Sequence, residues 1–277
     1  MKPLSDWPLA ARRNIIGIFT DIDDTLTTDG AITADALYAL GDLKAAGLHV
    51  IAITGRPVGW SEEVAFAGDR TWPVDAVVAE NGSVAIFLGE KDTLPKFDVH
   101  KTLSKIYQQD SVTRFGNYAR MQQVAQRVLR EVPGAQMSQD SGGRETDIAI
   151  DHSEFTHLSA DKIEQVVQIM QAEGMNATVS SIHINGWFGD HNKLSGARWI
   201  VHKLFGRQLD SEIDRWAYVG DSTNDALMFE HFVNSVGVAN IRRFEAGLSH
   251  KPRYISNGER GAGFAEFAQV LLQRTES

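Results

Sequence analysis

The sequence predicts an α/β protein in which a doubly wound, Rossmann-like parallel sheet is interrupted by an inserted α+β domain. Near both ends of the chain, short apolar runs alternate with amphipathic helical patterns, which is typical of βαβ units. Between residues 89 and 189 the apolar runs shorten and alternate with polar residues, as in a half-exposed antiparallel sheet. The length of 277 residues corresponds to roughly two domains of about 150 residues. We therefore expect a core domain of residues 1–88 and 190–277 and an inserted domain of residues 89–189.

The first part of the core domain is predicted to contain four strands. They are expected at residues 15–19, 48–53, 74–79 and 83–88. Between the first two, Thr33 is a suitable helix N-cap, and Gly47 stands where a left-handed glycine commonly ends a helix. Another helical stretch spans about residues 61–68, and Asn81-Gly82 predicts a hairpin turn between the last two strands.

The inserted domain repeats the order helix, strand, strand. Helices are expected at residues 117–132 and 159–173, and strands at residues 135–139, 146–151, 177–181 and 183–187. The second helix has the stronger pattern, because Ile163, Val166, Val167 and Met170 share one face and Gly174 follows its end. The domain is therefore predicted to be an αββαββ unit.

After residue 192 the alternation of helices and strands returns. Helices are expected at residues 193–204, 223–231 and 263–273, and strands at residues 216–219 and 235–238. Because parallel strands need long crossover connections, these helices are expected to complete the doubly wound sheet.

Composition and charge exclude several classes of function. The chain has 27 Lys and Arg against 36 Asp and Glu, a net charge of −9, and no basic patch, so we expect no nucleic-acid partner. The absence of cysteine excludes thiol catalysis, thiolate zinc sites and disulfides. Residues 1–13 do not read as a signal peptide and no run of about 18 apolar residues occurs, so we expect a cytoplasmic protein without a membrane partner.

Acidic and polar side chains gather where predicted strands of the core end. Asp21, Asp23 and Asp24 follow the first strand, Thr54 follows the second, and Asp221 and Asp225 follow the strand at residues 216–219. Ligands of open α/β sheets bind at these carboxyl ends, and Asp21 and Asp23, two residues apart in extended chain, point the same way. Two carboxylates about 4 Å apart repel by about 4 kcal/mol at an effective dielectric of 20, so the cluster needs a cation or must hold protons. Oxygen ligands with room for water favour Mg²⁺.

Any one of these aspartates is equally well explained as a helix cap or a turn residue. Their occurrence at three strand ends at once favours a site.

Four segments carry a resemblance to a known family. They are Asp21-Ile22-Asp23-Asp24-Thr25-Leu26-Thr27, Thr54-Gly55-Arg56, Lys193 and Gly220-Asp221-Ser222-Thr223-Asn224-Asp225. In this order they resemble the four motifs of the haloacid dehalogenase superfamily of phosphotransferases. The insertion between the second and third motifs is similar to the αββαββ cap of the branch that contains the Cof-like sugar phosphatases, sucrose-phosphate phosphatase and phosphomannomutase.

The resemblance implies a role for each motif residue. Asp21 is expected to be the nucleophile that forms an aspartyl-phosphate, and Asp23 the acid/base that protonates the leaving oxygen and then activates water. Lys193 and Mg²⁺ are expected to offset the repulsion between the nucleophile and a phosphate dianion. Thr54 is expected to donate a hydrogen bond to a phosphoryl oxygen.

The resemblance also implies a ligand set for Mg²⁺. It consists of the Asp21 and Asp221 carboxylates and the Asp23 main-chain carbonyl, with Asp225 behind them in support. Asp24 departs from the family pattern, because its position is often glycine in this branch, and it adds negative charge near the metal.

Further residues are candidates for contact with substrate. Thr25, Gly55 and Asn224 lie within the matched motifs. Arg56 is equally suited to capping a helix and to reaching substrate. Asn81 is explained by its turn, although the corresponding loop faces the substrate in similar proteins.

The inserted sheet offers a polar face. His183 and Asn185 alternate with the isoleucines at positions 182 and 184, and Asp147 and Asp151 alternate with apolar residues in the same way. We expect His183, Asn185 and one or both of these aspartates to bind a sugar, with Arg144 as a partner for a second anionic group. The alternative is a sheet face that is merely solvated.

Together the motifs predict a Mg²⁺-dependent phosphatase that hydrolyses a small phosphomonoester, a sugar or polyol phosphate. Two alternatives remain: a sugar phosphomutase, which shares the aspartyl-phosphate, and a non-hydrolytic phosphoaspartate regulatory module. The expected partner is a small phosphorylated metabolite, and the expected assembly is a monomer or homodimer. The inserted domain is expected to close over the site, with hinges near residues 82–89 and 186–189.

Overall fold

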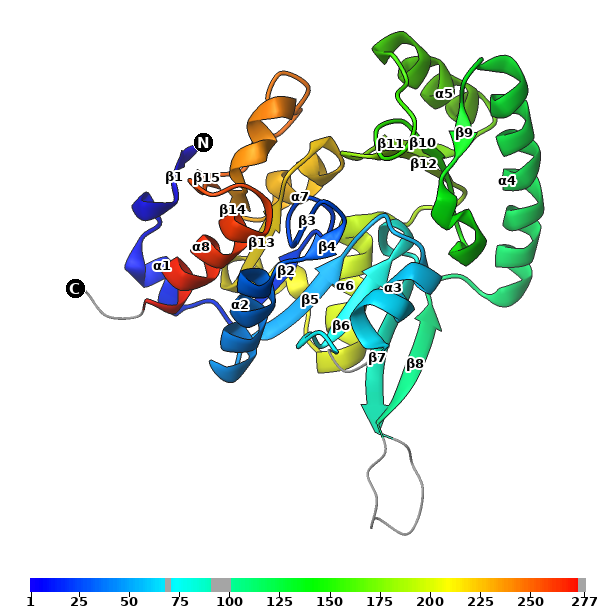
Figure 1. Ribbon diagram of the computed structural model, residues 1–277. Coiled ribbons are helices and arrows are strands. Elements are labelled where there is room, and N and C mark those ends of the chain that lie inside the picture. Colours follow the sequence, from blue (N-terminus) through cyan, green and yellow to red (C-terminus); the bar gives the residue numbers. More distant parts are fainter. Residues whose placement is uncertain (68–70, 91–100, 274–277) are drawn as a thin grey trace.

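The computed structural model describes residues 1–67, 71–90 and 101–273 (Figure 1). Within these residues nine strands form one sheet in the order β1-β15-β14-β13-β2-β5-β6-β7-β8. The strands are β1 (Lys2–Pro3), β2 (Gly17–Thr20), β5 (His49–Ile53), β6 (Ala76–Ala79), β7 (Val84–Glu90), β8 (Lys101–Tyr107), β13 (Trp216–Gly220), β14 (Asn234–Gly237) and β15 (Tyr254–Ile255). Seven of them are parallel, and β7 and β8 extend one edge as antiparallel strands. The predicted doubly wound α/β core is confirmed.

Helices cover both faces of this sheet. The helices of the core are α1 (Leu9–Arg13), α2 (Ala34–Ala45), α3 (Val58–Phe66), α6 (Lys193–Phe205), α7 (Ala226–His231) and α8 (Arg260–Leu272). Successive residues of a strand enter opposite cores: Ile18 packs with residues of α2 and α8, whereas Phe19 packs with residues of α6 and α7. Helix α3 begins earlier than residue 61, and Gly68, its predicted end, lies outside the described residues.

A minor hairpin of β3 (Thr27–Thr28) and β4 (Ala31–Ile32) follows β2. None of the helices in the described ranges combines the length and the hydropathy that crossing a membrane requires.

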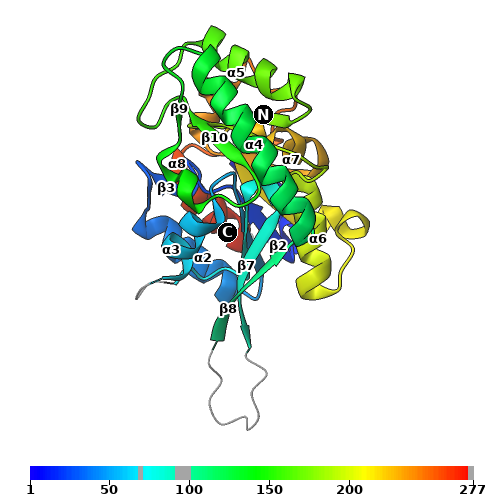
Figure 2. The ribbon, with the colours of Figure 1, turned by 90° about the vertical axis from the view of Figure 1, so that its right-hand side faces the viewer.

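The inserted domain has the predicted αββαββ order. Its elements are α4 (Ser111–Glu131), β9 (Gln136–Met137), β10 (Ile148–Asp151), α5 (Ala160–Ala172), β11 (Asn176–Val179) and β12 (His183–Trp187). In the described part of the chain, four of its strands pair in the order β11-β12-β10-β9. Figure 2 shows this domain above the core. Helices α4 and α5 pack on one face of its sheet, against strand residues that include Ile148, Ile150 and Ile184.

Helix α4 begins six residues earlier than predicted, at Ser111 instead of residue 117. The Asp110 side chain accepts a hydrogen bond from the Thr113 amide at 2.9 Å and caps the helix. Val112 and Phe115 in the first turns are exposed, so this part of the helix shows no amphipathic pattern.

Strand β8 is an element that the sequence patterns did not predict. It lies within the expected insertion, residues 89–189, yet it pairs with β7 along its whole length, from Val84↔Tyr107 to Glu90↔Lys101. Residues 82–89, one of the expected hinges, include most of β7, which is paired on both sides. We therefore propose that the chain passes from the core to the inserted domain near residues 107–111.

Candidate active site

The predicted cluster forms because three neighbouring parallel strands end together. Strand β2 lies between β13 and β5, so Asp21, Asp221 and Thr54, which follow these strands, reach the same edge of the sheet. Oxygen atoms of Asp21, Asp221 and Asp225 lie within 4.8 Å of one another, and all three side chains are buried. The structure thus brings together the acidic residues that the sequence placed at separate strand ends.

Lys193 is the cation of this cluster. Its Nζ donates to Asp21 Oδ1 at 2.6 Å and to Asp225 Oδ1 at 2.7 Å, and the residue is only 4% exposed. Asn192 fixes the start of α6 through a capping box with Ser195, so the side chain of the next residue is directed at the site. Burial favours the neutral amine, but the two carboxylates outweigh it and raise the pKa of Lys193.

Asp225 is saturated by donors. Besides Lys193, its Oδ1 accepts from the Tyr218 hydroxyl at 2.5 Å. Its Oδ2 accepts from the backbone amides of Asp221 and Ser222 at 2.9 and 3.2 Å. A carboxylate has about four acceptor sites, so Asp225 has none to spare and holds Lys193 and the Asp221 backbone in place. Its predicted place behind the metal ligands stays a prediction.

Asp221 has the opposite environment. Its Oδ2 accepts from Asn240 Nδ2 at 2.9 Å, while no donor among the described residues reaches its buried Oδ1. Burial, together with the negative charge of Asp21, raises the pKa of Asp221 well above its usual range.

The same causes act on Asp21, whose pKa burial raises to about 8 against the opposing effect of Lys193. The cluster therefore contains three buried carboxylates and one ammonium group. The unpaired oxygen, the short spacing and the all-oxygen donor set fit a hard divalent cation such as Mg²⁺.

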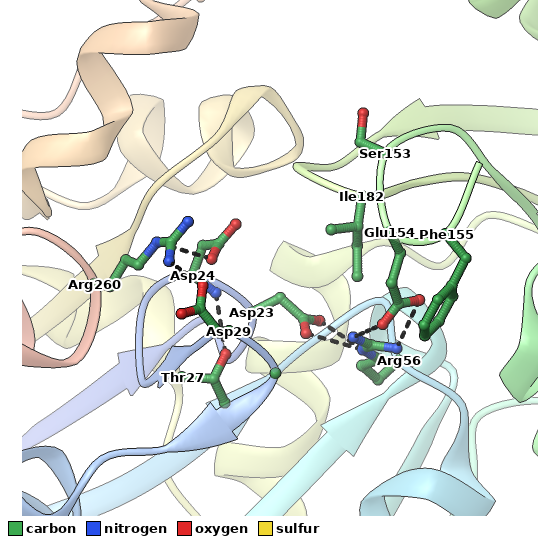
Figure 3. Close-up of a pocket in the computed structure, with 11 residues that line it drawn as sticks. Asp23, Asp24, Thr27, Asp29, Arg56, Ser153, Glu154, Phe155, Ile182 and Arg260 are labelled. Atoms are coloured by element: carbon green, nitrogen blue, oxygen red, sulfur yellow. Dashed lines mark hydrogen bonds and ion pairs between the residues drawn. The ribbon is translucent and has the colours of Figure 1, made fainter. Parts of the chain in front are cut away.

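Arg56 connects Asp23 to the inserted domain. Arg56 Nε donates to both oxygens of Asp23, at 2.9 and 3.0 Å. Its other nitrogens donate to Asp140 Oδ2 at 3.1 Å and to Glu154 Oε1 at 2.8 Å. Figure 3 shows Arg56 between Asp23 and Glu154. Arg56 makes no capping hydrogen bond to α3, whose N-cap is Pro57, and its contact with substrate stays a prediction.

A narrow cavity joins these groups to the inserted sheet. Its lining comprises Asp21, Asp23, Thr54, Gly55, Arg56, Ser180, Ser181, Ile182, His183, Asn185, Ser222 and Asn224. Gly55, Arg56, His183, Asn185 and Asn224, which were predicted to contact substrate, line this cavity, and their contact with substrate stays a prediction. Thr54 Oγ1 accepts from the Arg56 amide at 3.0 Å, so its hydroxyl proton remains available for a phosphoryl oxygen. Ile182 lines the cavity and does not share the apolar face of Ile184.

The Arg144 side chain is occupied by contacts within the protein instead of facing a place for a second anionic group. Its guanidinium donates to Gly55 O at 3.0 Å, to Asp147 Oδ1 at 2.7 Å and to Asp140 Oδ1 at 3.2 Å, and its side chain is 1% exposed. Asp147 also accepts from Asn81 and Asn185, at 3.3 and 3.1 Å. The contacts with Gly55 and Asn81 join the inserted domain to the core, and Arg144, Asp147 and Asn81 do not themselves line the narrow cavity.

Two other predicted residues also lie apart from that cavity. Asp151 accepts backbone amides from residues 153–156, and so holds the loop after β10. Thr25 is buried, does not line the cavity, and its hydroxyl lacks a hydrogen-bond partner in the described part of the chain.

Several residues of the site escaped the sequence patterns. Tyr218 lies within the predicted strand at residues 216–219 and Glu80 directly before the predicted Asn81-Gly82 turn, and neither was singled out as a candidate. Glu80 is buried and accepts from Val58, Glu145 and Thr146 amides, which ties the core to the inserted domain. Asn240 follows β14 as Asp221 follows β13, so the strand-end rule applied to one more strand could have found it.

Comparisons with known proteins agree with this geometry. The sequence model of the haloacid dehalogenase-like hydrolases matches residues 18–243. No curated protein matches the chain by sequence.

Solved structures share the fold at low sequence identity. A protein from Thermoplasma acidophilum has a TM-score of 0.62 at 17% identity, covering 93% of this chain and 98% of its own. The sucrose-phosphatase from Synechocystis sp. PCC6803, solved with sucrose and phosphate, has a TM-score of 0.61 at 15% identity, covering 92% and 97%. A sugar phosphatase of HAD subclass IIB has a TM-score of 0.58 at 15% identity, covering 92% and 96%.

Proposed function

The chain belongs to the haloacid dehalogenase-like hydrolases, and on that premise we propose that it is a Mg²⁺-dependent phosphatase acting on a small sugar or polyol phosphate. The observation that carries the proposal is the pair Asp21 and Asp23 at the end of β2. One is held by the buried ammonium of Lys193 and the other by the guanidinium of Arg56. Two adjacent carboxylates with different partners suit different chemical tasks.

Asp21 is proposed to be the nucleophile. Its Oδ1 is fixed by Lys193, while the narrow cavity in front of it is lined by Thr54 and Ser222. Attack of a carboxylate on a phosphate dianion brings like charges together, so the positive charge of Lys193 lowers the barrier. Thr54 is proposed to donate its hydroxyl proton to a phosphoryl oxygen.

Asp23 is proposed to be the acid/base. It lies at the boundary between the narrow cavity and a wider cavity under the inserted domain. From there it can protonate the leaving oxygen when the aspartyl-phosphate forms, and then remove a proton from the water that hydrolyses the intermediate.

The residues that would hold Mg²⁺ are Asp21 and Asp221, with the main-chain carbonyl of Asp23 as a further ligand. When bound, the ion supplies positive charge that offsets the phosphoryl oxygens. Asn240 orients Asp221 through its Oδ2 and leaves Oδ1 for the ion.

The substrate class is supported by the inserted sheet. His183 and Asn185 present polar groups to the narrow cavity, and hydroxyl-rich substrates match such a surface. Two of the structural relatives are named as phosphatases of sugar phosphates, which favours the same class here.

The test measures inorganic phosphate released from a panel of sugar, polyol and nucleoside monophosphates, with Mg²⁺ or with EDTA. We expect turnover that requires Mg²⁺ and falls at least about 10³-fold in Asp21→Asn, because covalent catalysis is lost. Asp210→Asn, which removes a surface carboxylate paired with Arg198, is the matched control and should retain full activity.

The proposal fails if wild type releases no phosphate from any ester, or if Asp21→Asn is as active as wild type. Isomerised sugar phosphate without free phosphate would instead identify a phosphomutase.

A further inference from the structure

A second cavity, of about 390 Å³, lies next to Asp23 between the core and the inserted domain (Figure 3). Its wall on the core side includes Asp24, Asp29 and Arg260. Because Asp23 is the proposed proton donor to the leaving oxygen, the leaving group of the substrate must lie on this side of the phosphoryl group. The volume is within the usual range for sites that bind small molecules.

The two arginines of this cavity are already engaged by carboxylates. Arg56 is paired with Asp23, Asp140 and Glu154. Arg260 lies 3.1 Å from Asp24 Oδ1 and donates to Asp29 Oδ1 at 2.7 Å. A second anionic group on the substrate would have to displace one of these carboxylates before it could bind a guanidinium.

The charge balance of the wall also opposes an anion. Four carboxylates line the cavity, those of Asp23, Asp24, Asp29 and Glu154, against the two guanidiniums of Arg56 and Arg260. The excess is two negative charges, or one while Asp23 carries the proton that it gives to the leaving oxygen. Hydroxyl or ammonium groups can donate to the unused acceptor sites of these carboxylates, whereas a carboxylate or phosphate meets repulsion.

The rest of the wall combines the hydroxyls of Thr27 and Ser153 with an apolar part. Phe155 is 64% exposed at the cavity, and Ile182 lies beside it. An aromatic ring that keeps so much surface in water offers a stacking face to the carbon skeleton of a polyol.

Backbone strain is concentrated at the same cavity. Five non-glycine residues have a positive φ in the described part of the chain, and three of them line this wall: Asp24 at 55°, Asp29 at 51° and Arg260 at 53°. Such conformations persist where the surrounding structure holds them, and they occur preferentially at ligand-binding sites.

We propose that this cavity receives the leaving group and selects esters whose leaving group is uncharged or carries an amine, while rejecting those with a second anionic group. Glu154 and Asp29 are the residues that set this selectivity. The proposal rests on the proposed phosphatase function, and it names the substrate class by charge.

The experiment uses three open-chain esters that differ at one carbon: glucitol 6-phosphate, gluconate 6-phosphate and 1-amino-1-deoxyglucitol 6-phosphate. Their kcat/KM values are compared in wild type, and their inhibition constants are measured against hydrolysis of p-nitrophenyl phosphate. We expect the gluconate ester to be at least tenfold poorer than the other two by both measures. The two measures together rank the esters even where one of them is turned over slowly.

Two variants locate the selectivity. Glu154→Gln removes the charge paired with Arg56 Nη2, and Asp29→Asn, at an 86% exposed side chain, removes the charge paired with Arg260 Nη1. In each variant the ratio of kcat/KM for the glucitol ester to kcat/KM for the gluconate ester should fall by three- to tenfold. The matched controls are Glu145→Gln and Asp210→Asn, because Glu145 pairs with Lys105 and Asp210 with Arg198, both outside this cavity. Both controls should leave the ratio of the two kcat/KM values unchanged.

The proposal is overturned if wild type treats the gluconate ester as well as the glucitol ester, or if the controls lower this ratio as much as the cavity variants do. Calorimetric binding of the three esters to Asp21→Asn gives the same ranking without turnover. A protein that binds the esters in the expected order but hydrolyses none contradicts the phosphatase function alone, and one that hydrolyses them without preference contradicts the selectivity alone.

Discussion

The carboxyl edge of the core sheet and the polar face of the inserted sheet both gather acidic side chains, but they balance the negative charge differently. In the core, Asp21 and Asp225 share the ammonium of Lys193, while Asp221 pairs with no cation at contact distance and its Oδ1 has no donor among the described residues. In the inserted domain, Asp147 is paired with Arg144, and Asp151 accepts four backbone amides.

The difference teaches that clustering alone does not identify a metal site. Carboxylates whose hydrogen bonds are complete stabilise loops and domain contacts, whereas a buried carboxylate oxygen without a partner marks the place where a cation is needed. The following predictions test that distinction, from the largest expected effect to the smallest.

The largest effect is expected from removing the buried cation of each region. Lys193→Met and Arg144→Met should each lower the free energy of unfolding by about 3–5 kcal/mol, because each leaves buried carboxylates unpaired. Saturating Mg²⁺ should restore part of the loss in Lys193→Met and none of it in Arg144→Met. Urea unfolding in EDTA and in Mg²⁺ measures both. An equal response of the two variants to Mg²⁺ would contradict the comparison.

Mg²⁺ itself should stabilise the wild type by about 2.7 kcal/mol at a concentration of one hundred times its Kd. Because the pKa of Asp21 is raised to about 8, the metal-free protein gains stability from this group at low pH and loses it as the pH rises towards 8. Mg²⁺ must displace the proton below that pH, so its apparent affinity should increase from pH 6 to pH 8.

Thermal unfolding with Mg²⁺ titrated at pH 6, 7 and 8 checks this expectation. Asp21→Asn, which has no proton to lose, should show a flatter dependence. An affinity for Mg²⁺ that does not change with pH in wild type would disprove the link to Asp21.

Asn240→Ala should weaken Mg²⁺ binding or activity by about 10–100-fold, as is usual when a residue that orients a metal ligand is removed. Its amide donates to Asp221 Oδ2 at 2.9 Å and to Asp24 O at 3.0 Å, and its Oδ1 accepts from the Arg260 amide at 2.9 Å. The expected signature is a higher Mg²⁺ requirement, with kcat recovered at saturation. Asn257→Ala, at an exposed asparagine paired with Glu266, is the control.

Asp151→Asn should have the smallest effect. An amide can accept at only one of its two ends, so the variant leaves some of the loop amides without an acceptor and should lose about 1 kcal/mol of stability. Its kcat/KM should stay within about twofold of wild type, because Asp151 acts on the loop and not on the reacting groups. A loss of activity without a loss of stability would indicate instead that Asp151 contacts the substrate.

The limits of the sequence are visible in single elements. The strand at residues 216–219 and the helix at residues 159–173 were predicted within one residue of β13 and α5, because their apolar periodicity is local. Strand β8 was not predicted, because only its pairing with β7 makes it part of the core sheet. The start of α4 was missed because its first turns expose Val112 and Phe115.

The sequence by itself determined the order of most helices and strands and the chemistry placed at the strand ends, because periodicity and residue type act over a few neighbouring residues. Only the tertiary structure decided which carboxylates are balanced. Lys193 meets Asp21 across 172 residues of sequence, and Arg56 meets Glu154 across 98. Charge compensation depends on such distant contacts, so the unpaired Asp221 oxygen and the engaged arginines beside Asp23 follow from the packing of the two domains.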